Sequence, residues 1–67
     1  MTQTLDIKIG GNFYRMDNLK QLEELRVIVC DMLGNKNLRP DNIVIGKFPY
    51  TETAEHSKTY HVEFRIV

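Results

Sequence analysis

The sequence predicts one α+β domain, spanning residues 1–67, in which a single helix packs on one face of a four-stranded sheet. Two segments near the ends of the chain alternate between apolar and polar residues, as half-buried strands do. A longer segment between them repeats apolar residues at helical spacing. Because one helix can cover only one face of a sheet, these observations together predict an α+β fold with the element order ββαββ.

The first and last predicted strands are the most regular. Residues 4–9 alternate, and the closing segment "KTYHVEFRIV" alternates over its whole length. Its apolar side carries Tyr60, Val62, Phe64 and Ile66, and its polar side carries Thr59, His61, Glu63 and Arg65. We expect these two strands to lie parallel and side by side at the centre of the sheet.

Two shorter strands are expected outside this pair. "FYRM", residues 13–16, follows a "GGN" segment whose residues tolerate the positive φ of a hairpin turn. "IVIGKF", residues 43–48, ends at Pro49, and "PYTETAEHS" then predicts a polar hairpin loop. The predicted spatial order is 2-1-4-3, and the alternative is 1-2-3-4 with the second and third strands parallel.

The helix is predicted within "DNLKQLEELRVIVCDMLGN". Asp17 or Asn18 can cap its first turn, Gln21 occupies the capping-box position after Asn18, and Gly34 suits a left-handed C-cap. At helical spacing one broad apolar face carries Leu19, Leu22, Leu25, Val29, Met32 and Leu33.

A family resemblance accompanies this order of elements. The segments "RPDNIVIGK" and "HVEFRIV" resemble the second half of the β-grasp family, whose ubiquitin-like members have the arrangement predicted above. The resemblance implies a β-grasp-like fold. It does not imply conjugation, because the chain ends in "RIV" and lacks a Gly-Gly tail.

Composition narrows the classes of function. The only cysteine, Cys30, excludes an internal disulfide and favours a reducing, cytoplasmic location. Nine basic residues balance nine acidic ones, so long-range attraction to nucleic acid or an anionic membrane is weak. No apolar run approaches the roughly 20 residues that a membrane span needs. A chain this short that begins at Met1 is expected to be a complete small gene product, of a size common in phages and mobile elements.

Two candidate protein-binding regions follow from the predicted arrangement. The first is the sheet face opposite the helix, with candidate residues Lys8, Arg15, His61, Glu63 and Arg65. The alternative interpretation of this region is a solvated face whose charges pair across strands, each pair contributing about 0.2–1 kcal/mol.

The second region consists of apolar residues in excess of what the core needs. "VIVC" is too wide for one helical stripe, which leaves Val27 and Ile28 outside it. In the third strand Val44 and Phe48 face the open side if the two isoleucines face the helix, and the reversed strand exposes the isoleucines instead. Such an edge strand invites pairing with another chain, either a second copy or a protein partner. Exposed single apolar residues without a function are the alternative.

The sequence gives little support for catalysis or metal binding. Cys30 lies in mid-helix with no histidine near it in sequence, and Ser57 beside His56 does not make a triad. Asp6 and Glu63 lie on a hydrated face, and His61 with Glu63 falls short of four zinc ligands. We therefore expect a non-enzymatic interaction module without a cofactor or metal, which self-associates and acts as an inhibitor or adaptor by occupying a partner's surface. The alternative is a nucleotide- or nucleic-acid-binding protein that uses the basic residues of the open face.

Overall fold

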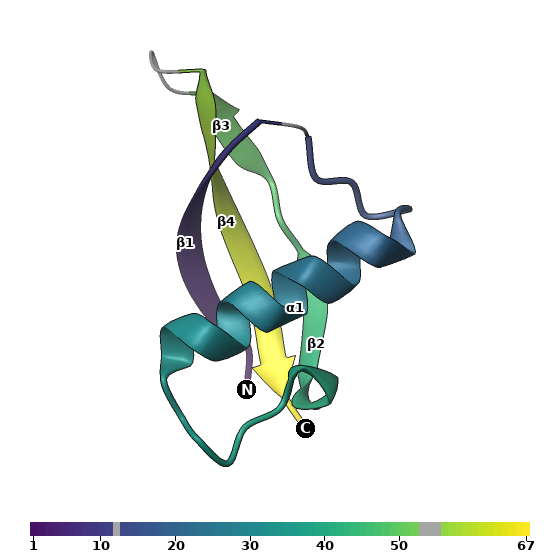
Figure 1. The fold of residues 1–67 in the computed structure, drawn as a ribbon, viewed down its shortest axis with the longest axis vertical. Coiled ribbons are helices and arrows are strands. Elements are labelled where there is room, and N and C mark those ends of the chain that lie inside the picture. Colours follow the sequence, from purple (N-terminus) through teal and green to yellow (C-terminus); the bar gives the residue numbers. More distant parts are fainter. Residues whose placement is uncertain (12, 53–55) are drawn as a thin grey trace.

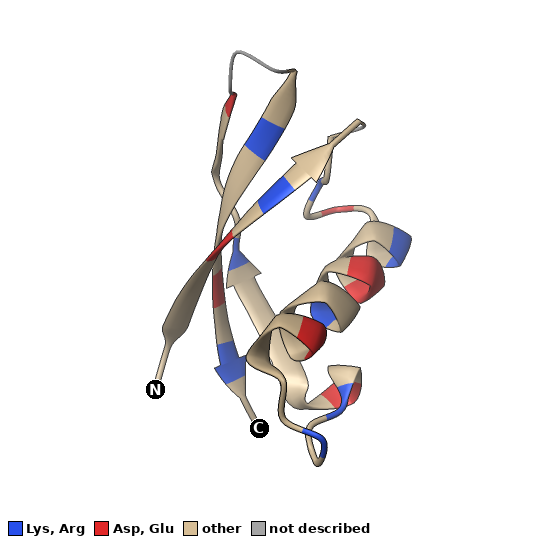
Figure 2. Cartoon of the chain, turned by 60° about the vertical axis from the view of Figure 1, so that its left-hand side comes forward, with Lys and Arg blue, Asp and Glu red and all other residues tan. Residues whose placement is uncertain are grey.

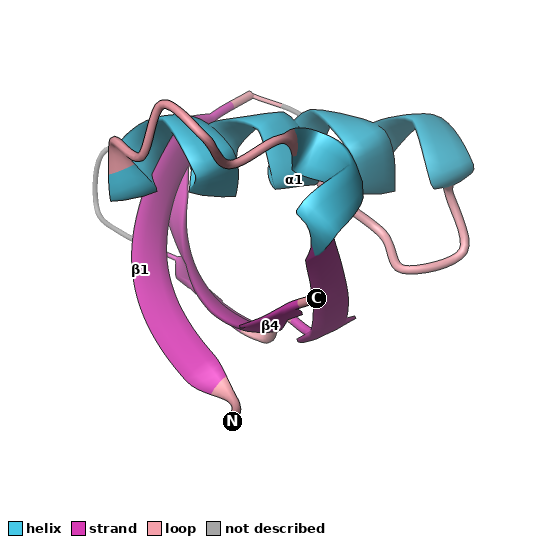
Figure 3. Ribbon diagram, turned by 90° about the horizontal axis from the view of Figure 1, so that it is seen from below, coloured by secondary structure: helices cyan, strands magenta, loops and turns pink. Residues whose placement is uncertain are grey.

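The computed structural model describes residues 1–11, 13–52 and 56–67. Its elements are β1 (Gln3–Gly10), α1 (Leu19–Leu33), the short 3₁₀ helix η1 (Pro40–Asn42), β2 (Ile43–Lys47), β3 (Tyr50–Glu52) and β4 (Ser57–Ile66). They form two layers, with α1 lying across one face of a curved four-stranded sheet (Figures 1 and 3). The predicted α+β class, with one α-helix and a four-stranded sheet, is confirmed.

The predicted strand order 2-1-4-3 is not confirmed, although the third predicted strand does lie beside the last one. β4 is the central strand, with β1 on one side and both β2 and β3 on the other, and every pairing is antiparallel. The first and last strands are neighbours as expected, but they run in opposite directions. Alternation identifies the buried face of a strand and carries no information about its direction. The β-grasp-like arrangement, which needs the parallel pair, is not confirmed.

The segment predicted as the second strand, residues 13–16, pairs with no strand in the described part of the chain. Its backbone groups bind side chains instead. The amide of Tyr14 donates to the hydroxyl of Tyr60 at 2.8 Å. The side chain of Gln21 donates to the carbonyl of Phe13 and accepts from the amide of Arg15, each at 2.8 Å. Gln21 therefore satisfies the backbone groups that a neighbouring strand would satisfy, and it does not complete the predicted capping box.

The third predicted strand contains a bulge. The register against β4 shifts by one residue between Ile45 and Lys47, so Ile45 is opposite Phe64 and Lys47 is opposite Glu63. An extra residue reverses the alternation of all that follow. For this reason Phe48, which was predicted on the open face, turns into the core and is 6% exposed.

The predicted loop after Pro49 begins with a strand. β3 continues the shifted register, with Tyr50 opposite Tyr60 and Glu52 opposite Lys58. Together β2 and β3 make one arm that pairs along most of β4. The rest of the predicted loop includes residues 53–55, which lie outside the described residues.

The helix begins and ends as predicted. The side chain of Asn18 accepts from the amide of Gln21, and Gly34 has the left-handed C-cap conformation, with φ of 67°. The predicted apolar face is only partly correct, because Leu19 is 76% and Met32 is 52% exposed. These residues belong to the first and last turns of α1, which extend past the sheet on either side (Figure 1).

The core lies between the middle of α1 and the sheet. Its buried residues are Ile7, Leu25, Val29, Ile43, Phe48, Tyr60, Val62 and Phe64. Full burial of one such large apolar side chain stabilises the fold by about 1.5–3 kcal/mol. The core is small, as expected for a chain of this length, and its stability is correspondingly modest.

Candidate protein-binding site

Aromatic side chains gather at the end of the sheet that α1 does not cover. Five of the six aromatic residues of the chain lie there, and only Phe64 lies elsewhere. Tyr60 is the centre of this cluster, with its ring centroid 5.6–5.9 Å from those of Tyr14, Phe48 and Tyr50. Phe13 packs edge-on against Tyr50 at 5.0 Å. Aromatic pairs in these geometries stabilise by about 0.5–1.5 kcal/mol beyond the area that they bury.

A lysine lies beneath this cluster. Lys58 is only 8% exposed, although most lysines in proteins lie on the surface. Its ammonium nitrogen lies 3.4 Å from the ring centroid of Phe13 and 5.9 Å from that of Tyr50. The faces of both rings are thus available to a buried cation, an attraction that strengthens as water is excluded. Lys58 therefore holds Phe13 and Tyr50 against the sheet.

Four side chains of this region face solvent, and we call them the aromatic surface: Phe13, Met16, Pro49 and Tyr50. Phe13, Met16 and Tyr50 are 45%, 48% and 44% exposed, and Pro49 is exposed as well. The surface borders a hollow of ≈ 510 Å³, which is lined by Tyr14, Met16, Lys47, Phe48, Pro49 and Tyr50. Contiguous exposed apolar residues of this kind are typical of binding sites.

The hydroxyl of Tyr14 closes the cluster on the side of the helix. It donates to the carboxylate of Glu24 in α1 at 3.0 Å. Partial burial, and then the hydrogen bond and negative charge of Glu24, raise the pKa of Tyr14 above its ordinary value of 10.0. The phenol therefore stays protonated and keeps this bond throughout the neutral range.

The open face of the sheet carries four of the five residues predicted there. Lys8 lies opposite Thr59, and Glu63 lies opposite Thr4. His61 lies opposite Asp6, with 2.6 Å between the ring nitrogen Nδ1 and the carboxylate oxygen. The last of the four is Arg65, which lies opposite Val44. The fifth predicted residue, Arg15, is not on this face, because it lies in the connection before α1 and pairs with Asp17 at 3.2 Å.

Charges on the open face compensate one another. Besides the contact between Asp6 and His61, Lys47 pairs with Glu63 at 3.4 Å. Figure 2 shows acidic and basic residues interspersed on both the sheet and α1, without a region of one sign. A small hollow of ≈ 160 Å³ is lined there by Thr2, Val44, Gly46, Glu63, Phe64 and Arg65.

The predicted apolar edge does not form one surface. Val44 lies on the open face, whereas Phe48 is buried and Ile28 packs against the core. Val27 is 53% exposed on the outer side of α1. These four residues therefore occupy three separate regions, because the bulge turns Phe48 inward and the helix rotation places Ile28 toward the sheet.

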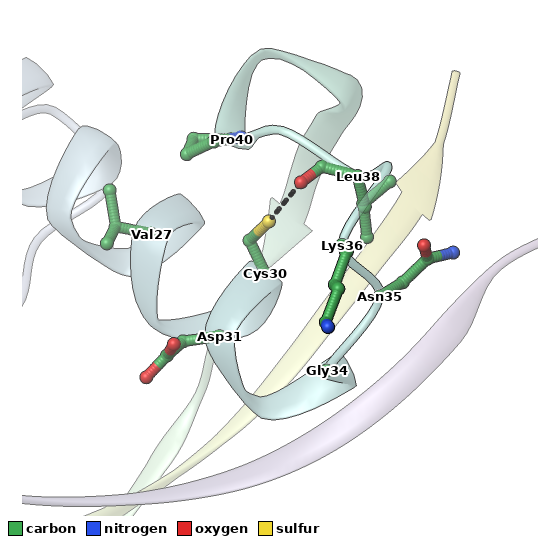
Figure 4. Close-up of a pocket in the computed structure, with 8 residues that line it drawn as sticks. All are labelled: Val27, Cys30, Asp31, Gly34, Asn35, Lys36, Leu38 and Pro40. Atoms are coloured by element: carbon green, nitrogen blue, oxygen red, sulfur yellow. Dashed lines mark hydrogen bonds between the residues drawn. The ribbon is translucent and has the colours of Figure 1, made fainter.

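Val27 and Cys30 line a separate groove beside α1. It has a volume of ≈ 370 Å³ and is lined by Val27, Cys30, Asp31, Gly34, Asn35, Lys36, Leu38 and Pro40. Figure 4 shows the thiol of Cys30 directed at the carbonyl of Leu38, with 3.1 Å between sulfur and oxygen. A hydrogen bond to a backbone carbonyl gives a thiol a structural role and does not activate it as a nucleophile.

Within residues 1–11, 13–52 and 56–67, no group of three or more His, Cys, Asp or Glu side chains is arranged to hold a metal ion. No helix in the described part of the chain has the length and apolar character needed to cross a membrane.

Sequence reasoning overlooked the aromatic surface and Lys58. The sequence did indicate where Lys58 points. It lies two residues before Tyr60 in β4, and alternate residues of a strand point to the same side, as Val62 and Phe64 also do. Gly46 inside a strand was a signal for the bulge that repositions Phe48. For Phe13 and Met16 the sequence carries no comparable signal, because their placement depends on the side chains of Gln21 and Tyr60.

Comparison with known proteins adds no identification. No protein-family model, no curated protein and no solved structure matches the chain.

Proposed function

We propose that this protein is a small non-enzymatic interaction module, which inhibits or links other proteins by occupying a partner's surface with its aromatic surface. The observation that carries this proposal is the exposure of Phe13, Met16 and Tyr50 side by side in a chain whose core is otherwise small. Aromatic residues and methionine are enriched at the centres of protein interfaces.

The aromatic surface is held in place before any partner arrives. Lys58 holds Phe13 and Tyr50 from below, and Gln21 fixes the backbone on both sides of Tyr14. Rings that are already ordered lose little conformational entropy on binding. This arrangement favours a binding role over a purely structural one.

The rim of the hollow indicates the chemistry of the partner. Lys47 lines the hollow, and its side chain is 70% exposed although it lies 3.4 Å from Glu63. A partner segment that inserts an apolar side chain beside Tyr50, and carries a carboxylate next to it, satisfies both the rings and this ammonium group. We therefore propose a protein partner with an acidic and apolar binding segment.

Nucleotide or nucleic-acid binding through the open face is supported less well. Single-strand binders combine aromatic platforms with a basic surface. Here the clustered rings lie on the face that carries α1, whereas the basic residues Lys8 and Arg65 of the open face lie among Asp6 and Glu63. Arg15, which was expected to join them, lies elsewhere.

The proposal can be tested with peptides selected from a displayed random library against the pure protein. We expect the selected peptides to combine acidic and large apolar residues. In NMR spectra their binding should shift the side-chain methyl of Met16 and leave those of Met1 and Met32 in place, because only Met16 borders the hollow. Met16→Asp should weaken binding by about tenfold or more, the scale of one interface hot spot.

Lys20→Ala, on the exposed first turn of α1, is the matched control and should bind as the unaltered protein does. Selected peptides that shift Met32 or the open-face residues while ignoring Met16→Asp would overturn the proposed site. Binding of a labelled single-stranded oligonucleotide that weakens with salt and with Arg65→Ala would favour the alternative.

A further inference from the structure

The two edges of the sheet differ in how well they are protected against pairing with another strand. The edge formed by β2 and β3 contains a bulge between Ile45 and Lys47 and a proline at position 49. Bulges and prolines are among the usual devices that prevent pairing at an edge. The other edge, β1, pairs with β4 over eight residues without a bulge or proline. β1 is therefore the edge that can accept another strand.

The backbone of β1 presents alternate residues to this edge. In β4 the amide of His61 donates to a carbonyl of the arm formed by β2 and β3. Because successive residues of an antiparallel strand direct their hydrogen-bonding groups to opposite sides, Tyr60 directs its groups toward β1, where it meets Ile7. The neighbours of Ile7, Asp6 and Lys8, thus direct their backbone groups away from the sheet.

We propose that a second copy of this chain occupies the edge, with the two β1 strands antiparallel about a twofold axis at Ile7. This register places Asp6 of each copy opposite Lys8 of the other. It also pairs Leu5 with Ile9, and Ile7 with its own symmetry mate. Residues that direct hydrogen-bonding groups outward then face residues that do the same, as an antiparallel ladder requires.

Side-chain chemistry supports this register on both faces of the extended sheet. On the open face the twofold generates two pairs of opposite charge, each of the kind that stabilises a sheet. On the opposite face, the partly buried Leu5 and Ile9 gain apolar neighbours from the second copy. A shift by one residue would place Asp6 opposite apolar residues and lose both sets of contacts.

The net charge of the chain and the position of α1 are both compatible with this pairing. The formal net charge is zero, so the copies do not repel one another at long range. The last turn of α1, which carries the exposed Met32, extends past β1 and would lie over an added strand (Figure 1). The pairing leaves the aromatic surface, which borders the other edge, accessible in each copy.

Charge exchange tests the register directly. Lys8→Glu places two like-charged pairs at the twofold and should weaken self-association about tenfold or more. Asp6→Lys should do the same. The double variant Asp6→Lys/Lys8→Glu exchanges the charges, restores both pairs and should return the dissociation constant to within a few fold of the original. Sedimentation equilibrium measures these constants, and circular dichroism checks that each variant is folded.

Thr4→Pro provides an independent test, because the amide of Thr4 points away from β4 and its loss spares the fold while weakening the dimer. The inference is overturned if the unaltered protein is monomeric at every concentration. It is also overturned if a dimer forms with the same constant in Lys8→Glu, or if the double variant is as weak as either single one. These outcomes are separable from the proposed function, since Met16→Asp should leave dimerisation unchanged.

Discussion

At the scale of single residues, Lys58 combines an 8% exposed side chain with two neighbouring aromatic rings. A buried ammonium group costs free energy unless something compensates for the lost water. Here the rings of Phe13 and Tyr50 compensate, at 3.4 and 5.9 Å from the nitrogen. The same contact orders two members of the aromatic surface, so one interaction serves both stability and the proposed binding.

A double-mutant cycle between Lys58 and Phe13 measures this contact. Lys58→Met keeps an unbranched apolar chain and removes the charge, and Phe13→Leu removes the ring. If the ammonium group attracts the ring, the double variant should be less destabilised than the sum of the two single ones, with a coupling of about 0.5–2 kcal/mol. Urea unfolding monitored by circular dichroism gives the free energies. Strict additivity would mean that the ring and the charge do not interact.

At the scale of elements, residues 13–16, which precede α1, are held by hydrogen bonds to side chains and not by a neighbouring strand. Gln21 binds the carbonyl of Phe13 and the amide of Arg15, and Tyr60 binds the amide of Tyr14. Each net hydrogen bond of this kind contributes about 0.5–1.5 kcal/mol. The path of residues 13–15, and with it the position of Phe13, therefore depends on the hydroxyl of Tyr60 and, for two of the three bonds, on the side chain of Gln21.

Removing that side chain should loosen the connection. Gln21→Ala is expected to destabilise the fold by about 1–2 kcal/mol, since both hydrogen bonds are lost. The amide of Arg15 should also exchange with solvent faster, which hydrogen-exchange NMR detects residue by residue. Lys20→Ala, next to it on the same turn, is the control and should change neither quantity. Unchanged exchange at Arg15 in Gln21→Ala would show that the rings alone hold the connection.

The same elements show which features could be predicted from the sequence and which could not. The strand at the end of the chain and the helix with its caps followed from local patterns, namely alternation over residues 58–67, the side chain of Asn18 and the left-handed backbone that Gly34 allows. The direction of β1 and the status of residues 13–16 depend on contacts between distant segments. No local pattern contains these contacts, so both predictions failed.

The candidate site was predicted less well than the fold, and the bulge explains much of the difference. One extra residue near Gly46 exchanges the two faces of everything from Lys47 to Glu52. Phe48 therefore lies in the core and not on the predicted surface. Tyr50 lies beside the exposed ring of Phe13. The placement of Lys8, His61, Glu63 and Arg65 on one face was foreseen because β1 and β4 contain no such shift.

At the scale of the whole molecule, small size connects stability to self-association. A chain of 67 residues buries a modest fraction of its surface and has little stability in reserve. A second copy that binds only the folded state adds to that stability by mass action. If the β1 edges pair as proposed, the fold should be measurably more stable at high protein concentration.

Thermal unfolding across a range of concentrations examines this coupling. The midpoint temperature of the unaltered protein should rise with concentration, by about 4–8 °C for each kcal/mol that dimerisation contributes in a domain of this size. Lys8→Glu, with like charges across the twofold, should need about tenfold higher concentration to reach the same rise. The charge-exchanged double variant should recover the dependence. A midpoint that rises equally in Lys8→Glu would assign the stabilising contact to another surface, of which the exposed Val27 on α1 is the next to examine.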